Sequence, residues 1–149
     1  MNSLDKSIDA MASTCIAVQM RMLNRVVTNI YDEALRPLSL KVSQMNILAA
    51  TLKMGVARPA AVCQRLHLDE STLSRNVERM KAKGWLEVVP DADGRAQPFR
   101  LTEAGRKLLE QAVPYWKRAQ ERATDLLGNG LIGPLGTAVK RLNQVGVLT

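Results

Sequence analysis

Asp69-Glu70-Ser71-Thr72-Leu73-Ser74-Arg75-Asn76-Val77-Glu78-Arg79-Met80 is the stretch of sequence that decides the fold. At 100° per residue, Leu73, Val77 and Met80 fall on one face of a helix. Asp69 is a good N-cap, and Gly84 is a suitable stop just beyond the C-terminus. We therefore expect a helix that begins after Asp69, runs to Lys83 and buries one apolar face.

The outward face of this helix carries small hydroxyls, one amide and two guanidiniums. Arg can make two hydrogen bonds to guanine, and Asn can make two to adenine. Ser and Thr hydroxyls can contact either bases or phosphates. The sequence therefore predicts a helix that enters the major groove of a DNA duplex, with six candidate contact residues: Ser71, Thr72, Ser74, Arg75, Asn76 and Arg79.

The flanking segments complete a recognisable motif. Pro59 is well placed as the first residue of a short helix that precedes residues 69–83. Residues 85–89 and 97–101 predict two short strands joined by a turn at 91–94, with Pro98 suited to an edge strand. Two helices joined by a tight turn and followed by a hairpin describe a winged helix-turn-helix.

The hairpin tip offers a second DNA contact. Arg95 follows an acidic turn, and a lone Arg on a ribbon can enter the narrow minor groove. Asp93 could brace the guanidinium, and Gln97 is a further candidate wing contact.

Long helices are expected on both sides of this lobe. Apolar residues recur at spacings of three and four over residues 7–35, which predicts one long helix with a stripe wide enough to pack on a second chain. Residues 43–54 predict a second helix. Thr102 is a suitable N-cap for a helix to Gly128 that bends at Pro114, and residues 132–145 predict a last helix. The expected fold class is mainly α with a small β-hairpin wing (α+β).

Composition is consistent with a polyanionic partner. The 149 residues carry a formal net charge of +7, and Lys and Arg displace counterions from phosphates. Aromatic residues make up only 3%, which disfavours binding of single strands through base stacking. Two cysteines, no signal-peptide pattern and no membrane-length apolar run predict a cytoplasmic protein with no membrane association.

The chain resembles the multiple-antibiotic-resistance-regulator (MarR) family of bacterial repressors. The densest match covers residues 68–86, and it continues in Asp91-Ala92-Asp93-Gly94-Arg95-Ala96 and in Leu101-Thr102-Glu103-Ala104-Gly105-Arg106. Residues 31–37 and 114–120 also look like one branch of the family. The resemblance covers nearly the full chain. One departure is Arg58, which stands where the family often has Thr or Ser and could contact a phosphate instead of capping a helix.

The resemblance implies a homodimeric regulator, with repression the expected activity, that binds a pseudo-palindromic operator. It implies a single MarR-type domain over residues 1–149, with a DNA-binding lobe at 38–102 and a helical dimerisation region at 1–37 and 103–149. Many members release DNA when a small effector molecule binds. No cofactor is implied.

Other readings remain open. Cys15 could make the protein a thiol-based redox sensor, although its place on the apolar stripe favours a buried, inert thiol. Cys63 and His67 are four residues apart, but a structural zinc site needs four ligands, so we expect no metal. The sequence has no pattern of catalytic residues and no phosphate-binding loop, so we expect that the protein is not an enzyme. A helical interaction module without DNA binding is the alternative from another class.

Overall fold

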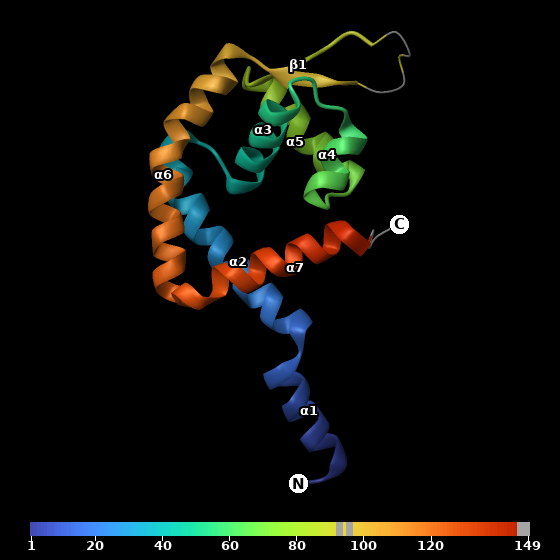
Figure 1. The fold of residues 1–149 in the computed structure, drawn as a ribbon, viewed down its shortest axis with the longest axis vertical. Coiled ribbons are helices and arrows are strands. Elements are labelled where there is room, and N and C mark those ends of the chain that lie inside the picture. Colours follow the sequence, from blue (N-terminus) through green and yellow to red (C-terminus); the bar gives the residue numbers. More distant parts are fainter. Residues whose placement is uncertain (92–93, 95–96, 146–149) are drawn as a thin grey trace. The chain divides into compact units, whose positions relative to one another are not determined.

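The computed structural model describes residues 1–91, 94 and 97–145, and it divides into two compact units. One unit holds residues 32–117, and the other holds residues 1–31 together with the chain from 118 onward. Helices dominate both units, and the only strands among the described residues form one hairpin (Figure 1). In chain order the elements are α1 (Ser3–Thr14), α2 (Ile16–Leu35), η1 (Arg36–Leu38), α3 (Val42–Met54), α4 (Pro59–Leu66), α5 (Glu70–Ala82), β1 (Leu86–Val88), β2 (Phe99–Leu101), α6 (Glu103–Leu127), η2 (Asn129–Leu131) and α7 (Ile132–Val145).

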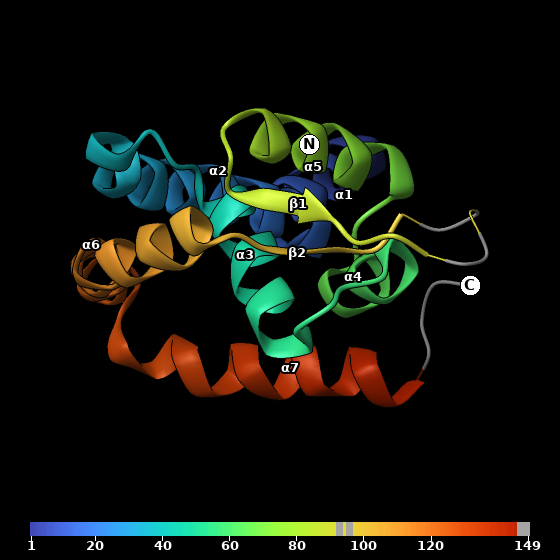
Figure 2. The same ribbon diagram turned by 90° about the horizontal axis from the view of Figure 1, so that it is seen from above.

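The core of the 32–117 unit is built around β2. Strands β1 and β2 pair antiparallel, with Val88 opposite Phe99. On the other side of β2, Phe99 exchanges two backbone hydrogen bonds with Ala57, which lies just before α4. The side chain of Phe99 is fully buried among residues of α3, α4 and α5. Figure 2 shows the hairpin lying beside α3, α4 and α5. The wing is thus joined to the helices at its base.

Helix α5 begins where the sequence predicts. The Asp69 carboxylate accepts a hydrogen bond of 2.6 Å from the backbone N–H of Thr72, as an N-cap should. Leu73 and Met80 are fully buried, and Val77 packs against the same core. The expected apolar face is therefore confirmed, and it fixes which residues of α5 face solvent.

The start of α6 is joined to the segment between α5 and β1 through a set of short contacts. The hydroxyl of Thr102 accepts a hydrogen bond from the backbone N–H of Gly105 and donates one to the carbonyl of Gly84. The backbone N–H of Thr102 donates to the carbonyl of Trp85. Thr102 is therefore the N-cap that the sequence predicts, and it also ties α6 to the wing.

The predicted single helix over residues 7–35 is wrong. The helix is interrupted at Cys15, whose backbone is extended (ψ 114°), and the helices α1 and α2 lie on either side of it. The hydroxyl of Thr14 donates back to the carbonyl of Ala10, and the amide of Gln19 donates to the carbonyl of Ser13 at 2.7 Å. The Gln19 amide supplies a donor to a carbonyl at the break, and a Thr hydroxyl bonded four residues back is a contact that often bends helices. Cys15 is only partly buried, contrary to the expected core position.

Other boundaries agree with the sequence to within a few residues. Helix α4 begins at Pro59 and α7 covers residues 132–145, as predicted. Helix α3 begins at Val42. Each strand has three residues, fewer than expected, and Pro98 lies outside β2. Pro114 lies inside α6.

In the other unit, α2 contacts the second half of α6. Ile30 of α2 is buried, as are Ala119 and Ala123 of α6. The Tyr31 hydroxyl donates a hydrogen bond to the Gln120 side chain, and burial raises the pKa of Tyr31. None of the helices in the described part of the chain has the length and apolarity needed to cross a membrane.

We expect Gly105→Ala to destabilise the protein by about 1–3 kcal/mol, because the new methyl group would meet the backbone carbonyl of Trp85 in a buried site. A backbone group held by Thr102 cannot move aside easily. Gly133→Ala is the matched control, since its methyl group would enter open space in α7. Urea denaturation of both variants checks the expectation, and equal stability of Gly105→Ala and wild type would contradict it.

Candidate nucleic-acid interface

The outward face of α5 displays the predicted DNA contacts with unequal exposure. Ser71, Ser74, Arg75 and Arg79 are exposed, whereas Thr72 and Asn76 are half-buried. Neither Arg75 nor Arg79 forms an ion pair with a described residue. Both guanidiniums can therefore reach a ligand without first breaking an ion pair within this part of the protein.

Four of the six α5 candidates already make hydrogen bonds near the start of the helix: Ser71, Thr72, Asn76 and Arg75, whose guanidinium donates to the Thr72 hydroxyl at 3.4 Å. The Asn76 amide donates to the backbone carbonyl of Thr72 at 3.0 Å, and the Ser71 hydroxyl donates to Asp69 at 3.0 Å. The bonds from Thr72 and Ser71 hold the pKa of Asp69 below its usual value. Ser71 thus supports the N-cap, and the Asn76 amide keeps its second N–H and its oxygen for a base.

A second group of cations borders this face. Lys41, at the N-terminus of α3, and Lys83, at the C-terminus of α5, line one groove together with Arg75 and Arg79. The Lys83 ammonium lies 4.6 Å from the centre of the Trp85 ring and donates to the carbonyl of Ser39 at 3.1 Å. Sequence reasoning missed these lysines. A Lys directly before a helix start was a usable signal for Lys41, whereas the place of Lys83 depends on contacts distant in sequence.

Two side chains whose role was not predicted from the sequence hold the start of α3 in place. The backbone N–H of Val42 donates to Asp32 at 2.8 Å, and that of Lys41 donates to Gln44 at 3.0 Å. These bonds satisfy amide donors at the helix N-terminus and fix the edge of the groove where Lys41 lies.

The wing candidates are described only in part. Asp93 and Arg95 lie outside the described residues. Gln97 is exposed and lines a hollow of about 430 Å³ between the wing base and α5, where Ser74 is also found. The structure therefore brings Gln97 and Ser74, which are distant in sequence, to one site.

Arg58 has a partner within the protein. It is the N-cap residue of α4 but makes no side-chain capping bond. Its guanidinium lies 3.3 Å from a carboxylate oxygen of Asp91, at the base of the wing. The Arg58 side chain is 61% exposed, and that of Asp91 is 16% exposed. This ion pair links the helix-turn-helix to the wing, beside the backbone bridge between Ala57 and Phe99.

The remaining candidates are not among the residues of this face. Cys15 belongs to the other compact unit. Burial, with smaller contributions from Glu70 and Asp69, raises the pKa of Cys63. His67 is exposed and ends α4 in a left-handed backbone conformation. The described residues contain no cluster of three or more His, Cys, Asp or Glu side chains suited to a metal ion.

The arrangement of α3, α4 and α5 with the two-stranded hairpin defines a winged helix-turn-helix protein. The sequence model of the MarR family matches residues 38–96. The multiple antibiotic resistance protein MarR of Escherichia coli is 29% identical over 91 residues, which are 60% of this chain and 63% of that protein. The chain thus spans about 63% of the length of the curated relatives that it matches.

Solved structures extend the match over nearly the whole chain. The transcriptional regulator MosR of Mycobacterium tuberculosis, solved in complex with DNA, is 31% identical, with 85% of this chain and 97% of that chain covered and a TM-score of 0.71. E. coli MarR in complex with operator DNA has a TM-score of 0.77 at 21% identity, covering 89% and 96%. Bordetella bronchiseptica BpsR, whose DNA binding is regulated by 6-hydroxynicotinic acid, has the same TM-score at 20% identity and the same coverage. The chain belongs to the MarR family.

We expect the Arg58–Asp91 ion pair to act as a unit in DNA binding. If Arg58 orients the wing through Asp91, Arg58→Gln and Asp91→Asn should each weaken binding, and the double variant should be no weaker than either single variant. A coupling of about 0.5–1 kcal/mol suits an ion pair with one exposed partner. Anisotropy titrations of a DNA duplex measure it.

The Arg100–Glu87 pair, 2.7 Å apart on the strands, provides a control Arg–carboxylate pair in which the Arg is similarly exposed, 55% against 61% for Arg58. A phosphate contact by Arg58 alone would give a different result. Arg58→Gln would then reduce the salt dependence of binding, and Asp91→Asn would leave affinity unchanged.

Proposed function

We propose that this protein is a sequence-specific regulator of transcription that binds double-stranded DNA as a homodimer and acts as a repressor. The observation that carries the proposal is the fixed rotation of α5: Leu73 and Met80 are buried, so Arg75 and Arg79 face outward. Membership of the MarR family supports the same function.

The residues around α5 divide into two roles. Arg75, with Thr72, Ser74 and Asn76, would contact base edges in the major groove, because these groups match the hydrogen-bonding patterns of guanine and adenine. Arg79 would share this role or contact a phosphate. Lys41 and Lys83 border the same groove as compact cations and would contact the phosphate backbone. Ser71 would contribute mainly by supporting the cap.

The wing would supply the minor-groove contact. Arg95 is the proposed inserted side chain, with Asp93 as its brace and Gln97 at its base. This role rests on the sequence pattern and on the anchoring of the hairpin base by Ala57, Arg58 and Asp91.

Dimerisation is supported by apolar side chains that the single chain leaves in solvent. Helix α7 exposes Ile132, Leu135, Val139 and Leu142, which recur at spacings of three and four. In α1 and α2 the exposed apolar residues include Ile8, Met11, Val18, Met22 and Val26. Such stripes pack against a partner helix. We propose residues 1–37 and 103–149 as the dimerisation region, with 38–102 as the DNA-binding lobe.

We propose that a small-molecule effector releases the protein from DNA. The proposed location is the cytoplasm, where a bacterial regulator meets its operator. A thiol-based sensor through Cys15 gains no support, because a reactive thiolate needs a stabilising neighbour and no described residue donates a hydrogen bond to the Cys15 sulfur.

Arg75→Ala should weaken binding to the specific operator by about 1–3 kcal/mol and relax sequence preference, because one base contact is lost. Lys140→Ala is the charge-matched control, since it removes one positive charge from α7. Anisotropy titrations against specific and scrambled duplexes measure both. Unchanged operator affinity of Arg75→Ala would contradict the placement of α5, and an absent salt dependence in the wild type would favour a protein-interaction module.

Val139→Glu should raise the dimer dissociation constant at least about 100-fold, because the carboxylate would be buried without a partner in the dimer. Lys140→Glu introduces the same side chain at the neighbouring position, away from the apolar stripe, and should leave the dimer intact. Sedimentation equilibrium distinguishes the two variants. A wild-type protein that sediments as a monomer would overturn the dimer proposal.

A further inference from the structure

Thr72 contacts both of the neighbouring side chains that could read bases from α5. The Arg75 guanidinium donates through Nη2 to the Thr72 hydroxyl at 3.4 Å. The Asn76 amide donates to the Thr72 backbone carbonyl at 3.0 Å. Thr72 is half-buried whereas Arg75 is exposed, and all three residues line one groove of about 610 Å³. The least accessible contact of Thr72 is thus with the side chain that reaches furthest into solvent.

The N-cap fixes the orientation of Thr72 in turn. The Asp69 carboxylate accepts the backbone N–H of Thr72 at 2.6 Å. A hydrogen bond from the Thr72 side chain is the largest cause that holds the pKa of Asp69 below its usual value, and the positive charge of Arg75 contributes to the same shift. Because a hydroxyl can donate and accept at once, Thr72 can donate to the carboxylate while it accepts from the guanidinium. The contacts therefore run in sequence from the cap through Thr72 to Arg75.

The contact with Thr72 leaves Arg75 able to bind a base. A guanidinium carries five N–H donors, and a bidentate contact with O6 and N7 of guanine uses two of them. An Arg side chain that is free in solution loses rotamer entropy when it is fixed against a base, and a side chain that is already held loses less. A held Arg75 would therefore bind guanine more tightly, and at a more closely defined position, than a free one.

We propose that Thr72 is a positioning residue for base recognition, whose hydroxyl orients the Arg75 guanidinium and whose backbone carbonyl orients the Asn76 amide. The inference rests on the proposed function and refines the part of Thr72 in it. Thr72 acts through its two neighbours, so loss of its hydroxyl changes what Arg75 recognises and leaves the contact of Asn76 in place.

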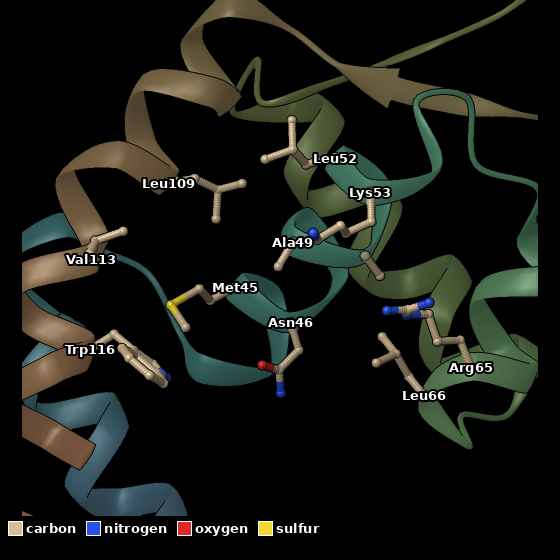
Figure 3. Close-up of a pocket in the computed structure, with 11 residues that line it drawn as sticks. Met45, Asn46, Ala49, Leu52, Lys53, Arg65, Leu66, Leu109, Val113 and Trp116 are labelled. Atoms are coloured by element: carbon tan, nitrogen blue, oxygen red, sulfur yellow. The ribbon is translucent and has the colours of Figure 1, made fainter. Parts of the chain in front are cut away.

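The order of the Arg75 guanidinium in the free protein tests the positioning without DNA. Arg65 is the reference, because it is exposed in the same 32–117 unit and lines a separate cavity that shares no residue with the groove (Figure 3). Among the described residues Arg65 has no ion-pair partner. NMR relaxation of the Nε–Hε groups should give Arg75 a higher order parameter than Arg65.

Two substitutions in the full chain assign this order to the hydroxyl. Thr72→Val removes the hydroxyl and keeps a branched side chain, so Arg75 should become as mobile as Arg65. Thr72→Ser keeps the hydroxyl and should restore the order of Arg75. Equal order parameters of Arg75 and Arg65 in the wild type, or an unchanged Arg75 in Thr72→Val, would overturn the proposal.

A panel of duplexes, each with one base pair changed from the sequence that the wild type selects, tests the effect on recognition. Thr72→Val should weaken binding about three- to tenfold and lose discrimination at the same base pair as Arg75→Ala. Discrimination at the base pair affected by Asn76→Ala should remain, because Val retains the backbone carbonyl. Thr72→Ser should bind within about twofold of the wild type.

Combining the substitutions separates positioning from direct contact. In an Arg75→Ala background, Thr72→Val should change affinity by less than about twofold, because the residue through which the hydroxyl acts is gone. Additive losses, or lost discrimination at a base pair that Arg75→Ala does not affect, would show that Thr72 binds DNA by itself and would overturn the proposal. Failure of the proposed function gives a different result, since the wild type would then bind every duplex of the panel alike or none, whatever the order of Arg75 in the free protein.

Discussion

Burial of Leu73 and Met80 sets the rotation of α5, and the rest of the proposed interface depends on it. A helix pinned by two fully buried side chains cannot turn about its axis without exposing them. The same rotation places Arg75 and Arg79 on the solvent side and leaves Asn76 at the edge, half-buried. The apolar face of α5 therefore determines which polar groups can meet a duplex.

Contacts distant in sequence then hold the neighbouring elements against α5. Phe99 lies between Ala57 and β1, so the strand that leaves the wing also contacts the segment that begins α4. Thr102 donates hydrogen bonds to the backbone carbonyls of residues 84 and 85, which connects the start of α6 to the chain that follows α5. Gly105 is required where α6 approaches the Trp85 carbonyl. The residue types of the 101–105 segment, with Leu101, Thr102 and Gly105, are thus explained by the fold and not by DNA binding.

The sequence predicted those parts of the fold that depend on local chemistry. Residue type and spacing were enough to predict the caps at Asp69 and Thr102, the start of α4 at Pro59 and the extent of α7. The winged fold and the family are confirmed. The break at Cys15 was missed because apolar periodicity continues across it, while side-chain bonds from Thr14 and Gln19 interrupt the helix. The Arg58–Asp91 pair and the groove position of Lys83 were also missed, since they join residues 33 and 44 positions apart. The contact roles of the candidate DNA-binding residues stay predictions.

The central claim is that two copies of α5 present hydroxyl, amide and guanidinium groups to one duplex. Selection of bound duplexes from a random pool by the purified protein, followed by sequencing, tests this claim most directly. The account predicts an inverted repeat whose half-site centres are about 10 base pairs, or one helical turn, apart. Enrichment of a lone half-site, or of no sequence at all, would contradict it.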